Sequence, residues 1–295
     1  MKKVGIVVLL SVFVGLGWYF FVKAGEFSVS FKAKTLPGDI IQSLAIWNKS
    51  LTPSEELQID SLSTVTQLMN VENRHYNYIW ELDRLNDSTT SVRVSISQPN
   101  RQLLNKLLVP FSSQPIEKDA ERLVREFYKV VQEHLKITRV NVEGIDTLDS
   151  RFCVCLPLKT KQTDKANGMM STYNFLVSYI EDNSLEVAGK PMIDIQSWDH
   201  NLGQLEFDFC FPIRESDSLP SDPSFFYKSI GLQKALKANF YGNYITSDRA
   251  WYYLKDYAAS HNLEVVGLPK EIFYNNPNMG IDETKWKAEV YLPVR

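Results

Sequence analysis

Two acidic residues occupy equivalent places near the ends of two similar segments. Asp208 lies four residues before Pro212 in FDFCFPI, and Glu289 lies four residues before Pro293 in AEVYLPV. A carboxylate among aromatic side chains loses contact with water, which raises its pKa and suits it to hold a cation or to act as a general base. The alternative is that both are ordinary polar residues on the wet face of an antiparallel sheet.

Residue alternation predicts which way these acids point. In the last segment Trp286, Ala288, Val290 and Leu292 share one face of a strand, which leaves Glu289 and its neighbours at odd positions on the other face. We expect the apolar face to pack against helices, so Glu289 should face a groove or solvent, and Asp208 should do the same in the earlier segment. Aromatic residues that could add cation–π contacts to a bound cation are Tyr241, Tyr244, Tyr274 and Tyr291.

Other chemistries find little support in the residue pattern. Three cysteines, Cys153, Cys155 and Cys210, are too few for a disulfide framework and lack the spacing of a zinc site. They could be small buried residues, or one pair could form a bridge. The four histidines are scattered, and no Ser-His-Asp arrangement, Cys-His arrangement or Gly-rich phosphate loop is present. We therefore predict no metal and no cofactor.

Composition limits the classes of partner. The chain has 35 acidic and 32 basic residues and a pI near 5.9, so it lacks the basic surface typical of a nucleic-acid-binding protein. Its length predicts more than one domain. We expect an anchor at 1–25, a first domain at 26–145 and a second domain at 146–295.

The N-terminal segment has the length of a membrane span. Lys2 and Lys3 precede an uncharged run at 4–22, closed by Lys23. Nineteen residues of helix reach about 28 Å, close to the roughly 30 Å of a bilayer core. We expect a transmembrane helix with a cytoplasmic N-terminus and exported domains, periplasmic if the source is Gram-negative. A cleaved signal peptide is the alternative.

The first domain alternates between strand and helix patterns. A strand pattern begins at Phe27, a turn and a short helix follow, and a hairpin spans Tyr76 to Ile96. A long amphipathic helix then follows Pro115. This order of elements resembles the helix-grip fold of the START-like or SRPBCC superfamily over about 27–140, which implies a cavity for a hydrophobic molecule. A filled α+β core is the alternative.

The second domain contains an internal repeat. LEVAGKP at 185–191 matches LEVVGLP at 263–269, identical at five of seven positions and offset by 78. Each copy follows an amphipathic helix pattern, with a strand before the helix and two strands after it. Both copies therefore predict strand-helix-strand-strand, and each ends on one of the segments that carry Asp208 and Glu289.

The double repeat, the LEVxGxP segments and the terminal EVYLPV resemble the GyrI-like small-molecule-binding domain, also found as the effector-binding part of AraC-type and MerR-type regulators. The resemblance covers about 151–295. It implies a groove that takes hydrophobic, often cationic or planar ligands, with an acidic residue at its floor that matches Glu289. Some members hydrolyse cyclopropane-bearing electrophiles. No DNA-binding segment accompanies the domain here, so direct regulation of transcription is not implied.

The predicted fold class is thus α+β: a transmembrane helix, a helix-grip-like domain and a duplicated GyrI-like domain. The predicted function is membrane-anchored binding of small hydrophobic or cationic molecules. Its predicted ligand-binding residues are Glu289, Tyr291, Asp208, Tyr274 and Tyr241. One alternative is a hydrolase in which Glu289 is catalytic, activating water against electrophilic cyclopropanoid molecules. A further alternative is a non-catalytic interaction scaffold of the cell envelope.

Overall fold

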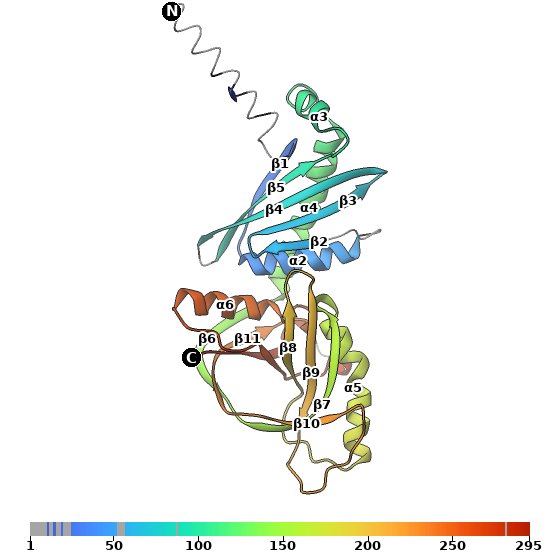
Figure 1. Cartoon of the computed structure of the whole chain (residues 1–295), viewed down its shortest axis with the longest axis vertical. Helices are drawn as coiled ribbons and strands as arrows, with labels where there is room; N and C mark the ends of the chain where they lie inside the picture. The colour runs from blue at the N-terminus through green and yellow to red at the C-terminus, as the bar shows by residue number, and fades with distance from the viewer. Residues whose placement is uncertain are drawn as a thin grey trace, which may run out of the picture. The chain divides into compact units, whose positions relative to one another are not determined.

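The computed structural model of the chain describes residues 25–51, 57–86, 88–280 and 282–295, together with Ser11, Val14, Gly15 and Tyr19. It forms two compact units. The first comprises Met1–Pro37 and Trp47–Val131, and the second comprises Gly38–Ile46 and Gln132–Arg295. Each unit is built on its own antiparallel sheet (Figure 1).

The predicted membrane anchor is corrected. Most of the run at 4–22 lies outside the described residues. Within the described part of the chain, no helix is both long enough and apolar enough to cross a bilayer, which takes about 20 mostly apolar residues. The predicted N-terminal transmembrane helix and the single-pass membrane localisation are therefore corrected. The structure gives no support to the predicted membrane partner or to exported, periplasmic domains.

The first unit has a five-stranded sheet in the order β1-β5-β4-β3-β2. All neighbouring strands are antiparallel. The predicted hairpin is formed by β4 and β5, whose alternating residues lie opposite one another. The elements of this unit are β1 (Phe27–Ala33), β2 (Leu57–Ser61), β3 (Thr64–Val71), β4 (Arg74–Asn86), β5 (Thr89–Ser97), α3 (Gln102–Leu108) and α4 (Pro115–Ile137) as far as Val131. The helix α2 (Pro37–Ser50) is divided between the units, because its residues Gly38–Ile46 belong to the second.

Aromatic side chains fill the space between this sheet and α4. The ring centroids of Trp80 and Phe127 lie 4.9 Å apart, and those of Trp47 and Phe127 lie 5.4 Å apart. Trp80 and Phe127 are fully buried, as expected for the apolar stripe predicted along α4. These contacts favour the filled core over an open cavity. The START-like resemblance itself stays a prediction.

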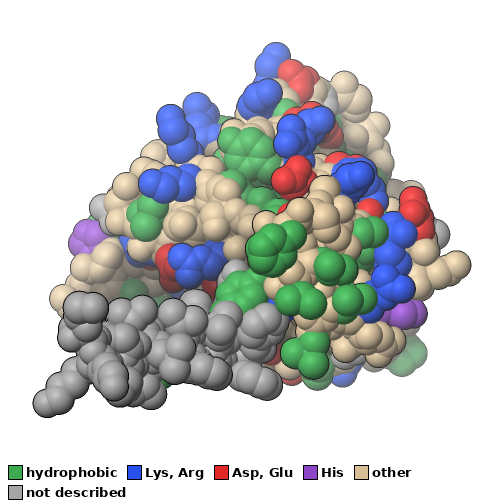
Figure 2. Space-filling model, turned by 90° about the horizontal axis from the view of Figure 1, so that it is seen from above, with side chains coloured by type: hydrophobic (Ala, Val, Ile, Leu, Met, Phe, Trp, Pro, Cys, Tyr) green, Lys and Arg blue, Asp and Glu red, His purple; other side chains and the backbone are tan. Residues whose placement is uncertain are grey.

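Apolar side chains of α3 and the residues after it lie on the surface. Leu103, Leu104, Leu107 and Phe111 are exposed. Apolar side chains also stand among lysines and arginines on the face seen from above in Figure 2. This short helix therefore adds little to the core of the unit.

The second unit has an eight-stranded sheet in the order β10-β7-β9-β8-β12-β13-β11-β6. The predicted duplication is confirmed, because β7-α5-β8-β9 and β11-α6-β12-β13 occupy the two halves of this sheet. The elements are β6 (Arg139–Leu148), β7 (Arg151–Lys161), η2 (Gln162–Asp164), α5 (Lys165–Asp182), β8 (Met192–Asp199), β9 (Gln204–Pro212), β10 (Phe226–Ile230), β11 (Gln233–Tyr241), η3 (Tyr244–Thr246), α6 (Arg249–Ser260), β12 (Lys270–Phe273), η4 (Pro277–Met279), η5 (Glu283–Lys285) and β13 (Lys287–Pro293).

The outer strands are exchanged between the two copies. β6 precedes the first copy but pairs with β11 of the second, whereas β10 precedes the second copy and pairs with β7 of the first. The two copies therefore share one continuous sheet and bury one common core, rather than forming two separable modules.

The shared LEVxGxP segments have a packing role. A Cβ atom added to Gly189 would lie 3.1 Å from the Pro212 ring, and one added to Gly267 would lie 3.0 Å from the Pro293 ring. Each glycine thus lets the segment pass close to the proline that ends its copy. The repeated Gly and the repeated terminal Pro are one contact, made twice.

The two faces of this sheet differ. Both α5 and α6 pack on one face, over a core that includes Phe207, Phe209, Val290 and Leu292. The opposite face carries a smaller buried cluster with all three cysteines. Cys155 and Cys210 are direct cross-strand partners and form a disulfide, while Cys153 is free and buried. Of the two possibilities raised by the sequence, the structure has the bridged pair.

Candidate functional site

Glu289 lies on the sheet face opposite the helices, where residue alternation predicts it. Its carboxylate accepts hydrogen bonds from Lys287 Nζ at 2.9 Å and from the Tyr291 hydroxyl at 3.0 Å. Lys237 Nζ lies 3.6 Å away. Burial would raise the pKa of Glu289, but hydrogen bonds from Lys287, Tyr274 and Tyr291 and the charge of Lys237 outweigh it, so the pKa lies below its usual value.

Asp208 lies on the same face, in the other copy. Lys228 Nζ is 2.5 Å from Asp208 Oδ2 and 2.6 Å from Asp194 Oδ2. Lys270 Nζ lies 3.0 Å from the second oxygen of Asp194. Burial would lower the pKa of Lys228, but its hydrogen bonds to Asp194 and Asp208 raise it overall. Both predicted carboxylates are therefore neutralised by lysines of the chain itself.

The predicted tyrosines surround Glu289 unevenly. Tyr291 is buried and bonded to Glu289, whereas Tyr274 is 40% exposed, with Lys287 Nζ 4.7 Å from its ring centroid. Tyr241 is paired with Lys287 across the strands, and the Arg139 guanidinium lies 4.4 Å from its ring centroid. Lysine and arginine thus occupy the positions over these rings that a ligand cation would need.

A pocket of about 480 Å³ opens on the other side of the sheet, next to α5. Its walls come from both copies: α5 and the segment before β8 from the first, and η3, β12 and the loop containing η4 from the second. Aromatic side chains dominate its lining, namely Tyr173, Phe209, Tyr244, Phe273, Tyr274 and Trp286. Asp208 and Glu289 are not among the described residues that line it.

Tyr244 anchors one wall of the pocket. Its hydroxyl donates to the Lys287 carbonyl at 2.8 Å and accepts from the Asn275 backbone N–H at 3.0 Å. Its ring lies 4.8 Å from that of Phe273 and 5.3 Å from that of Trp286, centroid to centroid. The wall is thus fixed by the fold before any ligand enters.

The equivalent place in the other half is filled. Trp198 and Asn276 are 78 positions apart, the offset of the repeat, as are Tyr173 and Trp251. Where Asn276 Nδ2 reaches Tyr173 at 3.4 Å beside the open pocket, the Trp198 and Trp251 rings pack 4.9 Å apart. A bulky indole in one copy and an amide in the other therefore explain why one side is open.

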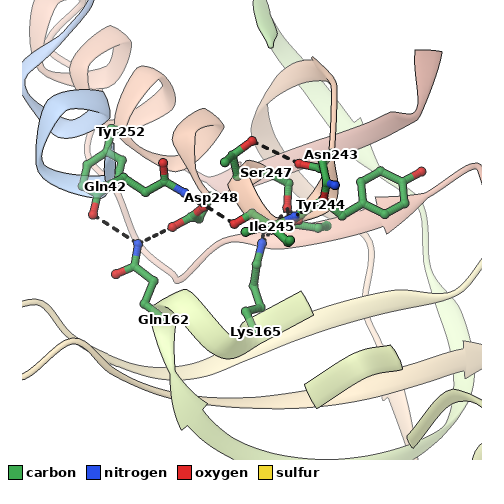
Figure 3. Close-up of polar contacts among 11 residues, drawn as sticks. Gln42, Gln162, Lys165, Asn243, Tyr244, Ile245, Ser247, Asp248 and Tyr252 are labelled. Atoms are coloured by element: carbon green, nitrogen blue, oxygen red, sulfur yellow. Dashed lines mark hydrogen bonds and ion pairs between the residues drawn. The ribbon is translucent and has the colours of Figure 1, made fainter. Parts of the chain in front are cut away.

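A fully buried polar cluster connects α5 with the second copy, and Figure 3 labels Lys165 and Ser247 from it. Lys165 Nζ is 2.6 Å from Ser247 Oγ and 2.7 Å from Glu271 Oε1, and Ser247 Oγ is 2.5 Å from Glu271 Oε2. Lys165 is next to the pocket residue Ala166 in the sequence, and Ser247 is two positions after the pocket residue Ile245. The cluster ties the first turn of α5 to the second copy and so holds the two walls together.

Sequence reasoning missed this pocket. Of the predicted ligand-binding residues, Tyr274 lines the pocket. Tyr244, which the sequence suggests only as a source of cation–π contact, lines it too. A signal was available in the repeat itself, because the two copies differ at Asn276 against Trp198. In the described part of the chain, no group of three or more His, Cys, Asp or Glu side chains could hold a metal ion.

Part of this chain is similar to several proteins of known structure. The C-terminal domain of EcmrR has 13% identity and a TM-score of 0.43, covering 54% of this chain and 98% of that one. EcmrR in its complex with DNA has 12% identity and a TM-score of 0.45, covering 65% and 76%. SAV2435 bound to tetraphenylphosphonium has 14% identity and a TM-score of 0.39, covering 52% and 94%.

No family model and no curated protein matches the sequence. Because the three TM-scores are below 0.5, the structural similarities carry no conclusion about this chain's ligand. The resemblance to the GyrI-like family stays a prediction, which rests on the repeat and its motifs.

Proposed function

We propose that this chain binds a small, mostly apolar molecule with an aromatic ring in the pocket beside α5. The observation that carries the proposal is the pocket itself, about 480 Å³ with six aromatic residues in its lining. Ligand sites are commonly apolar hollows of about 300–1,000 Å³ with a few polar groups. Aromatic rings would stack on a flat ligand, and the asparagines of the lining would orient it.

The proposed role of Glu289 is indirect. Tyr274 lines the pocket, and its hydrogen bond to Glu289 raises the pKa of Tyr274 together with burial, which is the larger cause. Glu289 would then position the Tyr274 side chain rather than touch the ligand. A cationic ligand at Glu289 or Asp208 would first have to displace a bound lysine, which leaves a partly buried ammonium without its partner.

Hydrolysis by Glu289 is less well supported than binding. A general base needs a free carboxylate oxygen within about 3 Å of an attacking water, and a pKa near the working pH. Both oxygens of Glu289 already accept hydrogen bonds, and its pKa lies below the usual value. A scaffold without a ligand would leave the open pocket unexplained.

The test uses two tryptophan substitutions on the same helix. Met170 lines the pocket and is 47% exposed, so Met170→Trp should fill the pocket without disturbing the core. Ser178 is also exposed on α5 but does not line the pocket, and Ser178→Trp is the matched control. The full chain is screened against flat aromatic compounds by thermal shift.

Compounds at 100 times their Kd should add about 2.7 kcal/mol to the free energy of unfolding, a shift of several degrees in Tm. The shift should disappear in Met170→Trp and persist in Ser178→Trp. If no compound shifts the wild type, or if Met170→Trp retains every shift, the proposed function is wrong.

A further inference from the structure

The pocket is electrically one-sided. Lys190 is the one charged residue among the described residues of its lining, and it is exposed. It lies in the short segment before β8, beside Pro191, which also lines the pocket. Within the described part of the chain, Lys190 has no ion-pair partner. A cation that no residue neutralises therefore faces a mostly apolar cavity.

The second copy shows that the segment does not require a lysine. At the repeat offset of 78, Lys190 corresponds to Leu268. Leu268 packs against the hydrophobic core, on the side where Trp198 fills the equivalent space. The same turn thus carries an apolar residue beside the filled site and a cation beside the open one. The lysine therefore accompanies the open pocket and the leucine accompanies the site filled by Trp198, and the backbone of this turn requires neither residue.

The acidic residues Glu289 and Asp208 on the opposite face of the sheet are poor sites for a cationic ligand, because lysines already pair with them. On the opposite face, Glu289 is held by Lys287, and Asp208 by Lys228. A cationic ligand there would have to replace an existing ion pair. An anion at Lys190 would replace only water, since it would gain an ion pair without breaking one.

We infer that the ligand of this pocket carries an anionic group, a carboxylate or a sulfonate, attached to its aromatic body, and that Lys190 pairs with this group. This inference rests on the proposed function, because it names the class of molecule that the same pocket takes. The rings of Tyr173, Tyr244 and Trp286 would hold the flat part, while the anionic group would point toward Lys190 at the rim.

Three compounds of nearly equal shape separate the possibilities: 1-naphthaleneacetate, 1-naphthaleneacetamide, and 2-(1-naphthyl)ethylammonium. Binding to the full chain is measured by isothermal titration calorimetry at low and high salt. We expect the acetate to bind about threefold to fivefold more tightly than the amide, the range for an ion pair near the surface. The ammonium compound should bind least tightly, and added salt should reduce these differences.

Substitutions at Lys190 then assign the effect to this residue. Lys190→Met keeps the aliphatic stem and should bring the acetate to the affinity of the amide. Lys190→Glu should favour the ammonium compound, and Lys190→Arg should keep the preference of the wild type. Lys32 is an exposed lysine of the first unit, so Lys32→Met is the control that should change nothing.

Two failures have different meanings. If all three compounds bind equally, or if the acetate keeps its advantage in Lys190→Met, the inference about charge is wrong while the pocket remains a binding site. If none of the compounds binds and the wider aromatic screen is also negative, the proposed function and this inference both fail.

Discussion

The buried Lys165 cluster allows a quantitative test of how the two copies are held together. Lys165→Met keeps most of the side-chain volume but removes the ammonium that contacts Ser247 and Glu271, at 2.6 and 2.7 Å. Lys165 and Glu271 are both fully buried, so Glu271 would be left as a charge without a cation in a dry site. Breaking a buried ion pair in this way costs about 3–5 kcal/mol.

The double substitution Lys165→Met with Glu271→Leu should cost much less, under about 2 kcal/mol, because apolar residues often replace a buried ion pair with little loss. Ser247 would still have an acceptor, since its hydroxyl already lies 3.0 Å from the Tyr244 carbonyl. The free energy of unfolding is measured in urea by circular dichroism, with tryptophan fluorescence as a second probe. The reasoning fails if Lys165→Met costs under about 1 kcal/mol, or if the two single losses simply add.

Three further outcomes are expected. Burial raises the pKa of Asp248 from 3.8 to about 6, so the protonated carboxyl stabilises the fold below about pH 4 and this stabilisation is lost as the pH rises through 6. Asp248→Asn should therefore remove about 3 kcal/mol of the pH dependence of the free energy of unfolding. Urea unfolding of the wild type and the variant at pH 4 and 7 measures this difference. Glu289→Gln should lower the free energy of unfolding by about 1–2 kcal/mol through the weakened contact with Lys287. Calorimetry should still detect naphthalene binding, weakened only a few-fold because the glutamine still offers Tyr274 an acceptor, whereas a complete loss of the heat signal would contradict the indirect role of Glu289. Trp198→Ala should lower the free energy of unfolding by about 2–3 kcal/mol, measured in urea, because it removes the ring that packs on Trp251. A decrease under about 0.5 kcal/mol would contradict the explanation that Trp198 fills the equivalent site in the other half.

The duplicated architecture could be predicted because its signals are local. The LEVxGxP segments repeat in the sequence, and residue alternation is enough to put Val290 and Glu289 on opposite faces of β13. A Cβ at Gly189 or Gly267 would lie only 3.1 or 3.0 Å from a proline ring, so the glycine in each segment has a packing reason.

The state of the predicted carboxylates could not be read from the sequence, because their partners come from distant strands. Lys228 on β10 reaches Asp208 only because the outer strands are exchanged between the copies. An isolated β10, five residues long, gives no signal of where it will pair. The sequence pattern therefore located the acids correctly but could not reveal that lysines neutralise them.

The pocket depends on differences between the copies rather than on what they share. Reasoning from the repeat drew attention to the positions where both copies are acidic, Asp208 and Glu289. The open site instead appears where the copies diverge, at Asn276 against Trp198 and Lys190 against Leu268. The prediction of a transmembrane helix was wrong for another reason: it relied on the apolar length and flanking lysines of one segment, and the described part of the chain contains no helix that could span a membrane.

The central claim is that the ligand site is the pocket beside α5, not the face that carries Glu289. The most direct measurement is a crystal structure of the full chain with 6-bromo-2-naphthoate, collected at the bromine absorption edge. The account predicts an anomalous bromine peak among Tyr173, Tyr244 and Trp286, with the carboxylate toward Lys190. A peak beside Glu289 or Asp208, on the opposite face of the sheet, would contradict it.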